Sequence, residues 1–214
     1  MTGIAEVVGV SPVMPVVVLD DAERAVPLAR ALAAGGVGVI EVTLRTPVAL
    51  EAIRRIADDV PEMLVGAGTV LDGVQARAAA DAGARFLVSP GATPRLLDEV
   101  LAADLPLLPG VATVGEVLAA REHGIRVMKF FPAGPAGGPA YLSAIASPVP
   151  DARFCPTGGI DEDSAPEYLA LPNVVCVGGS WLAPAAALRA GDWGTVTRLA
   201  ARASGWRAAG LPLS

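Results

Sequence analysis

The feature that most constrains the fold of this chain is a repeating unit of about two dozen residues. Each unit contains a short apolar run, a turn marked by glycine or proline, and an alanine-rich stretch with helical periodicity. Such apolar runs predict buried parallel strands, and the stretches between them predict the crossover helices that parallel strands require. The predicted strands start at intervals of roughly 20 to 27 residues, near Pro15, Gly38, Met63, Arg85, Pro106, Arg126, Arg153 and Val174.

Helix start signals support the same reading of the intervening stretches. Asp21 precedes the first stretch, and Thr-Pro pairs at 46–47 and 93–94 precede the second and the fourth. Side-chain oxygens at these positions accept from free backbone N–H groups, and proline is well tolerated in the first helical turn. The stretches with the clearest helical periodicity are 22–34, 48–58, 73–82, 93–103 and 113–123.

Eight strand–helix units predict an α/β fold with one domain over residues 1–214. The expected architecture is a closed TIM (β/α)₈ barrel with its helices on the outside. A short helix before residue 13 is expected to close the bottom of the barrel, and residues 192–209 to form a terminal helix outside it. A doubly wound open sheet is the alternative, because it shows the same alternation of strands and helices.

The composition favours a large core and narrows the range of partners. Hydrophobic residues make up 53% of the chain and charged residues 18%, which suits a packed domain. The net charge of −6 argues against nucleic acid and anionic membranes as partners. The start of the chain lacks the features of a signal peptide, and no apolar run is long enough to span a membrane. We therefore expect a cytoplasmic protein in which Cys155 and Cys176 are reduced and buried.

Polar residues interrupt the second predicted strand. Alternation along residues 39–45 places Glu41, Thr43 and Arg45 on one face and apolar residues on the other. The apolar face suits the helix layer, so we expect the polar face to point into the barrel. A purely structural ion pair between Glu41 and Arg45 is the alternative, but burying charges for stability alone seldom gains free energy. The pattern therefore favours a functional site.

The sixth predicted strand contains Lys129, the only lysine of the chain, whereas the other fifteen basic residues are arginine. Arginine evidently serves wherever a positive charge is needed, but only lysine can lose its proton and attack a carbonyl carbon. A salt-bridge lysine or a phosphate ligand is the alternative interpretation. We predict that Lys129 is the Schiff-base amine of a class I lyase and that Glu41 exchanges protons with the reacting groups.

Glycine-rich segments end three other predicted strands. The third strand ends with Gly66-Ala67-Gly68-Thr69, and the last two end with Thr157-Gly158-Gly159 and Gly178-Gly179-Ser180. In the last two positions such segments predict a phosphate site, because glycine exposes backbone N–H groups; tight turns are the alternative. The chain has one histidine, His123, expected at a helix end, and no cluster with the ligand spacing of a metal site. We therefore expect no metal or organic cofactor.

Taken in order, these segments resemble the bacterial 2-keto-3-deoxy-6-phosphogluconate (KDPG) aldolases, a family that includes 2-keto-4-hydroxyglutarate (KHG) aldolases. The resemblance covers nearly the whole chain. It rests on segments 41–46 (EVTLRT), 66–70 (GAGTV), 89–91 (SPG), 108–110 (LPG), 129–133 (KFFPA), 153–160 (RFCPTGGI) and 178–182 (GGSWL).

The resemblance implies a homotrimeric TIM barrel that cleaves KDPG reversibly to pyruvate and glyceraldehyde 3-phosphate. Lys129 would form the Schiff base and Glu41 would act as the acid and base. The alternatives are KHG or the galactonate epimer of KDPG as the substrate and, from another class, a non-catalytic sugar-phosphate-binding barrel.

The resemblance also implies roles in substrate binding. Arg45 and Thr69 would hold the pyruvate carboxylate, Phe131 would pack against the pyruvyl group, and Thr157 would contact the aldehyde-derived part. One departure concerns the phosphate. Where family members often carry a basic residue, this chain has Pro139-Ala140 after two glycines. Phosphate binding would then depend on Ser180 and on the backbone donors of Gly158, Gly159, Gly178 and Gly179.

Overall fold

Two parallel sheets form the centre of the computed structural model, which describes residues 3–206 and 208–210. The larger sheet has the strand order β5-β4-β3-β2-β1-β9, and the smaller has the order β6-β7-β8. The strands of the larger sheet are β1 (Val13–Val17), β2 (Val39–Thr43), β3 (Leu64–Gly68), β4 (Leu87–Val88), β5 (Leu107–Leu108) and β9 (Val177–Gly179). The strands of the smaller sheet are β6 (Gly110–Val111), β7 (Val127–Phe130) and β8 (Arg153–Pro156).

The predicted closed eight-stranded TIM barrel is wrong, although the α/β class holds. The larger sheet curls into a half-barrel, and the smaller sheet is a separate ladder. Pro109 separates β5 from β6, and its nitrogen carries no hydrogen to continue a ladder. On the other side, no ladder joins β8 to β9 among the described residues, and the two segments meet through isolated bridges, Phe154 to Val174 and Thr157 to Gly178.

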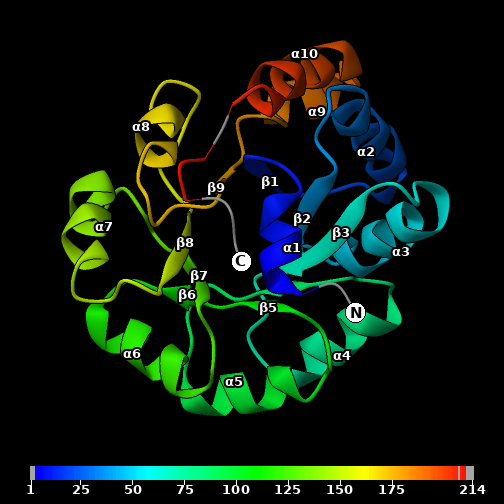
Figure 1. Cartoon of the computed structure of the whole chain (residues 1–214). Helices are drawn as coiled ribbons and strands as arrows, with labels where there is room; N and C mark the ends of the chain where they lie inside the picture. The colour runs from blue at the N-terminus through cyan, green and yellow to red at the C-terminus, as the bar shows by residue number, and fades with distance from the viewer. Residues whose placement is uncertain (1–2, 207, 211–214) are drawn as a thin grey trace.

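The doubly wound alternative is also wrong. The strand order of the larger sheet has no central reversal, because β1 lies between β9 and β2 and the remaining strands follow in sequence. Figure 1 shows the strands curling around a common centre, with the helices outside them.

Helices occupy all five stretches in which the sequence shows helical periodicity. They are η1 (Ala22–Arg24) with α2 (Ala25–Ala34), α3 (Ala49–Asp59), α4 (Gly73–Asp81), α5 (Pro94–Leu101) and α6 (Val114–Glu122). Asp21 and Thr93 cap their helices as predicted. Thr46 does not cap α3, because its hydroxyl instead donates to the carbonyl of Leu19 at 2.6 Å.

The remaining helices lie toward the ends of the chain and in its second half. They are α1 (Ile4–Gly9), α7 (Gly138–Ala146), α8 (Ala165–Leu169), α9 (Ala185–Ala190) and α10 (Trp193–Ser204). The predicted terminal helix over 192–209 is therefore shorter, and residue 207 within that range lies outside the described residues. Within the described ranges, no helix combines the length and the apolar character needed to cross a membrane.

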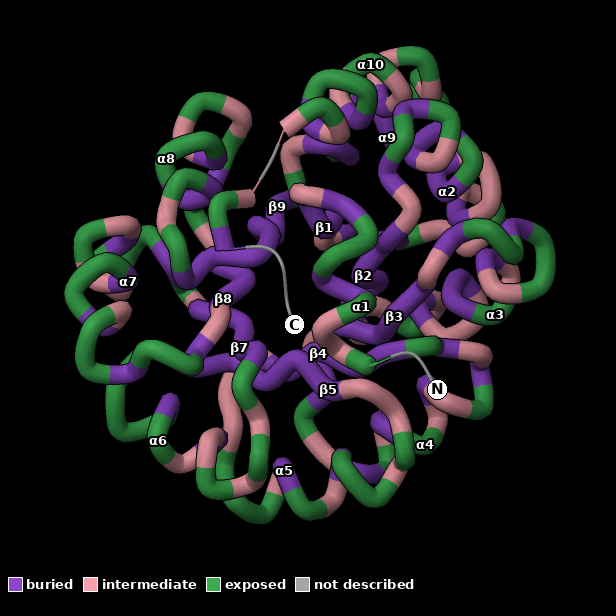
Figure 2. Tube along the Cα trace, viewed as in Figure 1, coloured by how far each residue is buried: buried purple, intermediate pink, exposed green. Residues whose placement is uncertain are grey.

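The buried side chains form two clusters, one on each face of the strands. The outer cluster fills the space between strands and helices and includes Ile40 and Val42. The inner cluster includes Met14, Phe86 and Cys155 and also takes in Val7 and Val8 of α1. Figure 2 shows the buried strands at the centre and the exposed positions on the outer faces of the helices.

Helix α1 is the helix expected ahead of residue 13, and it lies over the centre of the curled strands (Figure 1). Its Ile4 and Ala5 share a cavity wall with Leu107 and Val127, which are the first residues of β5 and β7. Helix α1 therefore covers the N-terminal ends of the strands and leaves the C-terminal ends free to carry a site.

Candidate active site

Glu41 and Lys129 form an ion pair in the interior enclosed by the two sheets. The Lys129 Nζ lies 3.2 Å from the Oε1 and 3.4 Å from the Oε2 of Glu41. The pair joins β7 to β2, which lie in different sheets. The side chains of Lys129 and Glu41 are only 5% and 2% exposed. Sequence alternation correctly placed Glu41 on the inner face, and the structure brings it to the only lysine.

Glycines on β3 make room for the larger inward-facing groups. A Cβ added at Gly68 would lie 2.1 Å from the Glu41 carboxylate, and one added at Gly66 would lie 2.4 Å from the ring of Phe86. These two glycines therefore accommodate the chain's own inward-facing side chains.

A cavity of about 250 Å³ opens above Lys129, at the C-terminal ends of the strands. Its polar side chains come from Arg45, Lys129, Thr157 and Ser180, and Gly158, Gly159 and Gly179 contribute backbone. The apolar part of the lining consists of Val16, Val18, Phe131 and Ile160. The cavity thus brings together most of the predicted site residues, from four separate segments of the chain.

Three predicted site residues stand behind this lining. Glu41 contacts the cavity through Lys129. Thr69 accepts a hydrogen bond at 3.2 Å from the Nε of Arg45. Gly178 lies against Thr157, because a Cβ at Gly178 would be 2.2 Å from the Thr157 Oγ1.

Arg45 lies at the mouth of the cavity and is held from behind by Thr69. Arg45 is exposed, and its Nε is held by the Thr69 hydroxyl, which leaves the terminal guanidinium nitrogens available to a ligand. Thr69 has a backbone φ of 61°, a left-handed conformation that is rare for a β-branched residue. Strain of this kind occurs where the surrounding structure fixes a functional side chain.

Phe131 and Thr157 form the walls beside the amine. The ring centroid of Phe131 lies 5.3 Å from the Lys129 Nζ, within the range of a cation–π contact. The Thr157 hydroxyl donates to the carbonyl of Cys155 at 3.3 Å, which fixes the orientation of this buried side chain. The arrangement presents an amine, a carboxylate, a guanidinium and an oriented hydroxyl to one small cavity.

Comparison with known proteins identifies the family. The family described as KDPG and KHG aldolase matches residues 4–199. The KHG/KDPG aldolase of Escherichia coli K12 is 50% identical over 202 residues, which cover 94% of this chain and 95% of that protein. This chain belongs to the KDPG and KHG aldolase family. It is an aldehyde-lyase.

Two solved structures of KDPG aldolases resemble this aldolase closely. The enzyme of Legionella pneumophila, with pyruvate captured at low pH as a covalent carbinolamine intermediate, matches with a TM-score of 0.92 and 47% identity. The match covers 94% of this chain and 98% of that one. The enzyme of Zymomonas mobilis with 3-phosphoglycerate also matches with a TM-score of 0.92 and 47% identity, over 99% and 100% of the two chains.

Sequence reasoning missed several residues of this aldolase site. Val16 and Val18 line the cavity from the end of β1, and Ile160 lines it beyond the second glycine pair. Apolar residues of this kind look the same in a sequence whether they line a cavity or fill a core. The Val18 side chain is 47% exposed although it follows a buried strand, and only the structure reveals this.

Backbone donors also line the cavity. Among the described residues, the N–H groups of Gly159, Ile160 and Ser180 have no protein acceptor. Gly158 and Gly159 have φ values of 97° and 77°, which glycine adopts without strain. Successive backbone donors in such conformations form concavities that bind anions.

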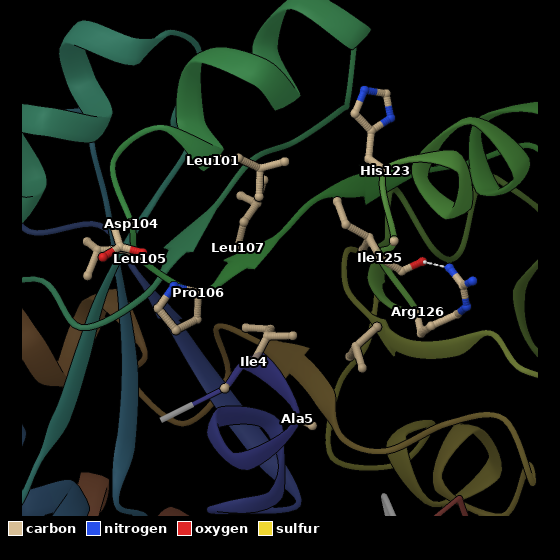
Figure 3. Close-up of a pocket in the computed structure, with 13 residues that line it drawn as sticks. Ile4, Ala5, Leu101, Asp104, Leu105, Pro106, Leu107, His123, Ile125 and Arg126 are labelled. Atoms are coloured by element: carbon tan, nitrogen blue, oxygen red, sulfur yellow. Dashed lines mark hydrogen bonds between the residues drawn. The ribbon is translucent and has the colours of Figure 1, made fainter. Parts of the chain in front are cut away.

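A larger cavity of about 600 Å³ lies at the opposite end of this aldolase, against α1 (Figure 3). Leu101, Leu105 and Ile125 make its lining mainly apolar. His123, at its edge, is the C-cap of α6 and lies 3.6 Å from Asp98, which confirms the expected helix-end position. Neither Lys129 nor Glu41 lines this cavity, so the chemistry belongs to the smaller one.

The cysteines and the possible metal ligands complete the inventory of reactive groups. Cys155 and Cys176 are free and buried, as predicted. In the ranges that the structure describes, no three His, Cys, Asp or Glu side chains are grouped so that they could hold a metal ion.

Proposed function

We propose that this aldolase cleaves KDPG reversibly to pyruvate and glyceraldehyde 3-phosphate through a Schiff base on Lys129. The observation that carries this proposal is the buried amine, 3.2 Å from the Glu41 carboxylate and open to a cavity with a guanidinium at its mouth. The carbinolamine of pyruvate in the Legionella pneumophila relative supports the same chemistry here.

The reaction begins with imine formation. Glu41 first takes a proton from the Lys129 ammonium, and the neutral Nζ then attacks C2 of the keto acid. A proton passes from the nitrogen to the former carbonyl oxygen and gives a carbinolamine. Glu41 returns its proton to this hydroxyl, which leaves as water, and the C2=Nζ iminium forms. Because Glu41 contacts the Nζ through both oxygens, it is within reach of each proton transfer.

Carbon–carbon cleavage follows from the iminium. Glu41, directly or through one water, removes the proton of the C4 hydroxyl, and the C3–C4 bond breaks to release the aldehyde. The electron pair moves through C3 and C2 onto Nζ and forms an enamine. Protonation at C3 and hydrolysis of the iminium then release pyruvate and restore the amine.

Arg45 and the glycine loops place the two ends of the substrate. The free guanidinium nitrogens of Arg45 suit a two-point contact with the carboxylate, which turns C2 toward the amine. The donors of Gly159, Ile160 and Ser180 also line the cavity and suit a phosphate. The structure of the Zymomonas mobilis relative with 3-phosphoglycerate supports a phosphorylated three-carbon compound as a ligand.

Borohydride trapping tests the proposed chemistry. Reduction in the presence of pyruvate should add a stable adduct to the peptide containing Lys129, and because the chain has one lysine the adduct maps to one site. Lys129→Arg should retain the fold and lose both the adduct and turnover. An unmodified Lys129 peptide in an enzyme that remains active would refute the Schiff base.

A comparison of substrates tests which aldehyde-derived half the site prefers. We propose KDPG over its galactonate epimer and over KHG because Thr157, within Pro156-Thr157-Gly158-Gly159, lines the cavity, where its hydroxyl would contact the aldehyde-derived half. Relative kcat/KM values for the three compounds decide the order. Release of pyruvate in a coupled assay separates the enzyme from a barrel that only binds sugar phosphates.

We also propose that the enzyme acts as a homotrimer in the cytoplasm. The family resemblance supports the trimer, and so do exposed apolar side chains such as Leu71 and Val74, which are 56% and 68% exposed. Light scattering after size-exclusion chromatography measures the mass of the assembly, and cell fractionation tests the location.

A further inference from the structure

Trp181 lies directly behind one wall of the candidate active site. It follows β9 in a turn and is half-buried. Its ring folds back onto Gly179, where an added Cβ would lie 1.6 Å and 2.0 Å from two ring carbons. Only glycine therefore permits this contact, and the ring covers the Cα of a residue that lines the cavity.

The backbone at the end of β9 is held from both faces. Successive residues of a strand present opposite faces. The inner face of Gly178 meets the Thr157 hydroxyl, where an added Cβ would be 2.2 Å from Oγ1, and the outer face of Gly179 meets the ring of Trp181. Two adjacent glycines have wide conformational freedom, and these two contacts restrict it. Trp181 itself does not line the cavity.

A second aromatic ring supports Trp181. The rings of Trp181 and Trp206 have centroids 6.5 Å apart and are inclined by 31°, a tilted aromatic contact. Trp206 follows α10, so the contact ties the turn after β9 to the helix layer. The mechanism proposed above uses neither tryptophan.

We propose that Trp181 is a positioning residue that fixes the backbone of Gly179 and Ser180 as the wall for the phosphate end of the substrate. The inference rests on the proposed function. Trp181 then contributes to affinity for the phosphorylated half of the substrate. It has no part in the Schiff-base chemistry, because this wall does not hold Lys129, Glu41 or Arg45 in place.

Two assays separate the two ends of the site. Cleavage of KDPG uses the whole cavity, whereas exchange of the pyruvate methyl protons in D₂O requires only the Schiff base and the carboxylate clamp. For Trp181→Ala we expect KM for KDPG to rise about tenfold, with kcat and the exchange rate within roughly threefold of wild type. We also expect its preference for glyceraldehyde 3-phosphate over unphosphorylated glyceraldehyde to shrink in the synthetic direction.

Matched variants control for a general loss of structure. Trp181→Phe keeps an aromatic ring and should show the same change with smaller size, about two- to fivefold in KM, even if Trp181→Ala does not fold. Trp193→Phe changes a half-buried tryptophan at the start of α10 that does not line the cavity, so it should leave both assays unchanged.

The proposal is overturned if KM for KDPG does not change in the Trp181 variants or if proton exchange falls in parallel with cleavage. Failure of the proposed function would look different. The wild-type enzyme would then not cleave KDPG, whatever residue stands at 181.

Discussion

Gly68 faces the carboxylate of Glu41 across the space between β3 and β2. Because an added Cβ would lie 2.1 Å from Oε1, Gly68→Ala must push the carboxylate away from Lys129. We expect kcat for KDPG cleavage to fall by about tenfold to a hundredfold, because a displaced acid and base transfers protons poorly. Steady-state kinetics with the purified variant measure the change.

Gly115→Ala is the matched control for Gly68→Ala. Gly115 is exposed in α6, and a Cβ there would approach nothing closer than 4.0 Å. This variant should keep full activity and gain about 0.5–1 kcal/mol of stability from better helix propensity. Full activity in Gly68→Ala would show that the carboxylate adjusts without loss.

Thr69 combines a strained backbone with a contact to the substrate clamp. Its φ of 61° costs about 1–3 kcal/mol for a β-branched residue, and its hydroxyl accepts from Arg45. Thr69→Gly should therefore be at least as stable as wild type toward urea. It should also raise KM for pyruvate in the exchange assay by about tenfold, because Arg45 loses its acceptor.

Thr69→Asn tests the two effects separately. Asparagine tolerates the left-handed conformation and offers an oxygen to Arg45, so it should recover most of the affinity for pyruvate. If Thr69→Gly unfolds at a lower urea concentration than wild type, the left-handed backbone of Thr69 does not destabilise the folded state.

The central pair of the site was predictable from sequence, but the role of Gly68 and the backbone conformation of Thr69 were not. A charged residue within an apolar strand can be recognised from the sequence and assigned to one face, because strand alternation has a fixed period. This reasoning identified Glu41 and Lys129. The role of Gly68 depends on which side chain of a neighbouring strand points at it. The positive φ of Thr69 depends on the loop around it. Neither the neighbour of Gly68 nor the φ of Thr69 can be predicted from the local sequence pattern.

Helix α6 shows how a local sequence signal becomes a pH-dependent contribution at the scale of an element. Glu116 accepts from the backbone N–H groups of Ala112 and Thr113, each at 2.8 Å, and Thr113 in turn caps the helix. The hydrogen bond from Ala112, with further ones from Thr113, holds the pKa of Glu116 below its ordinary value of 4.5. A lowered pKa in the folded state stabilises the protein above that ordinary value, and the contribution is lost as the pH falls through the folded value.

Glu116→Gln should therefore be less stable than wild type at pH 7 by about 0.5 kcal/mol. The difference should shrink as the pH falls below 4.5, as measured by urea unfolding at several pH values. Glu122→Gln, at the other end of α6, is the control and should be neutral or slightly stabilising, because a negative charge opposes the helix dipole there. A difference that is constant with pH would mean that the Glu116 charge has no part in the cap.

The helices and the sheet breaks differ in how far sequence predicts them. Helix periodicity and caps are local, so the five periodic stretches are all helical. The break between β5 and β6 is also marked in the sequence, by Pro109. Whether a proline ends a strand or lies within one depends on the partner strands, which the local sequence does not show. The weak contact between β8 and β9 has no local sign, because it depends on how far the sheet curls.

At the scale of the whole molecule, the two sheets meet at a seam where β8 approaches β9 and where Cys155 lies close to Cys176. The neighbouring Cys155 thiol, together with burial, raises the pKa of the Cys176 thiol well above its ordinary value of 9.0. Since the folded pKa is raised, this thiol stabilises the fold fully below the unfolded pKa, and the contribution is lost as the pH rises through the folded value. The seam should therefore weaken in alkaline solution.

Urea unfolding across the alkaline range tests the seam. We expect constant stability from this thiol up to about its ordinary pKa of 9.0, followed by a loss of about 1.4 kcal/mol per pH unit, because the unfolded thiol ionises while the buried one does not. Cys176→Ala removes this slope and leaves the contributions of all other groups, so the difference between the two proteins isolates the thiol. The same burial should keep both cysteines unreactive toward iodoacetamide at pH 8 until the protein unfolds. Rapid labelling of the native enzyme, or equal alkaline slopes in the two proteins, would mean that the fold does not keep the Cys176 thiol buried and protonated.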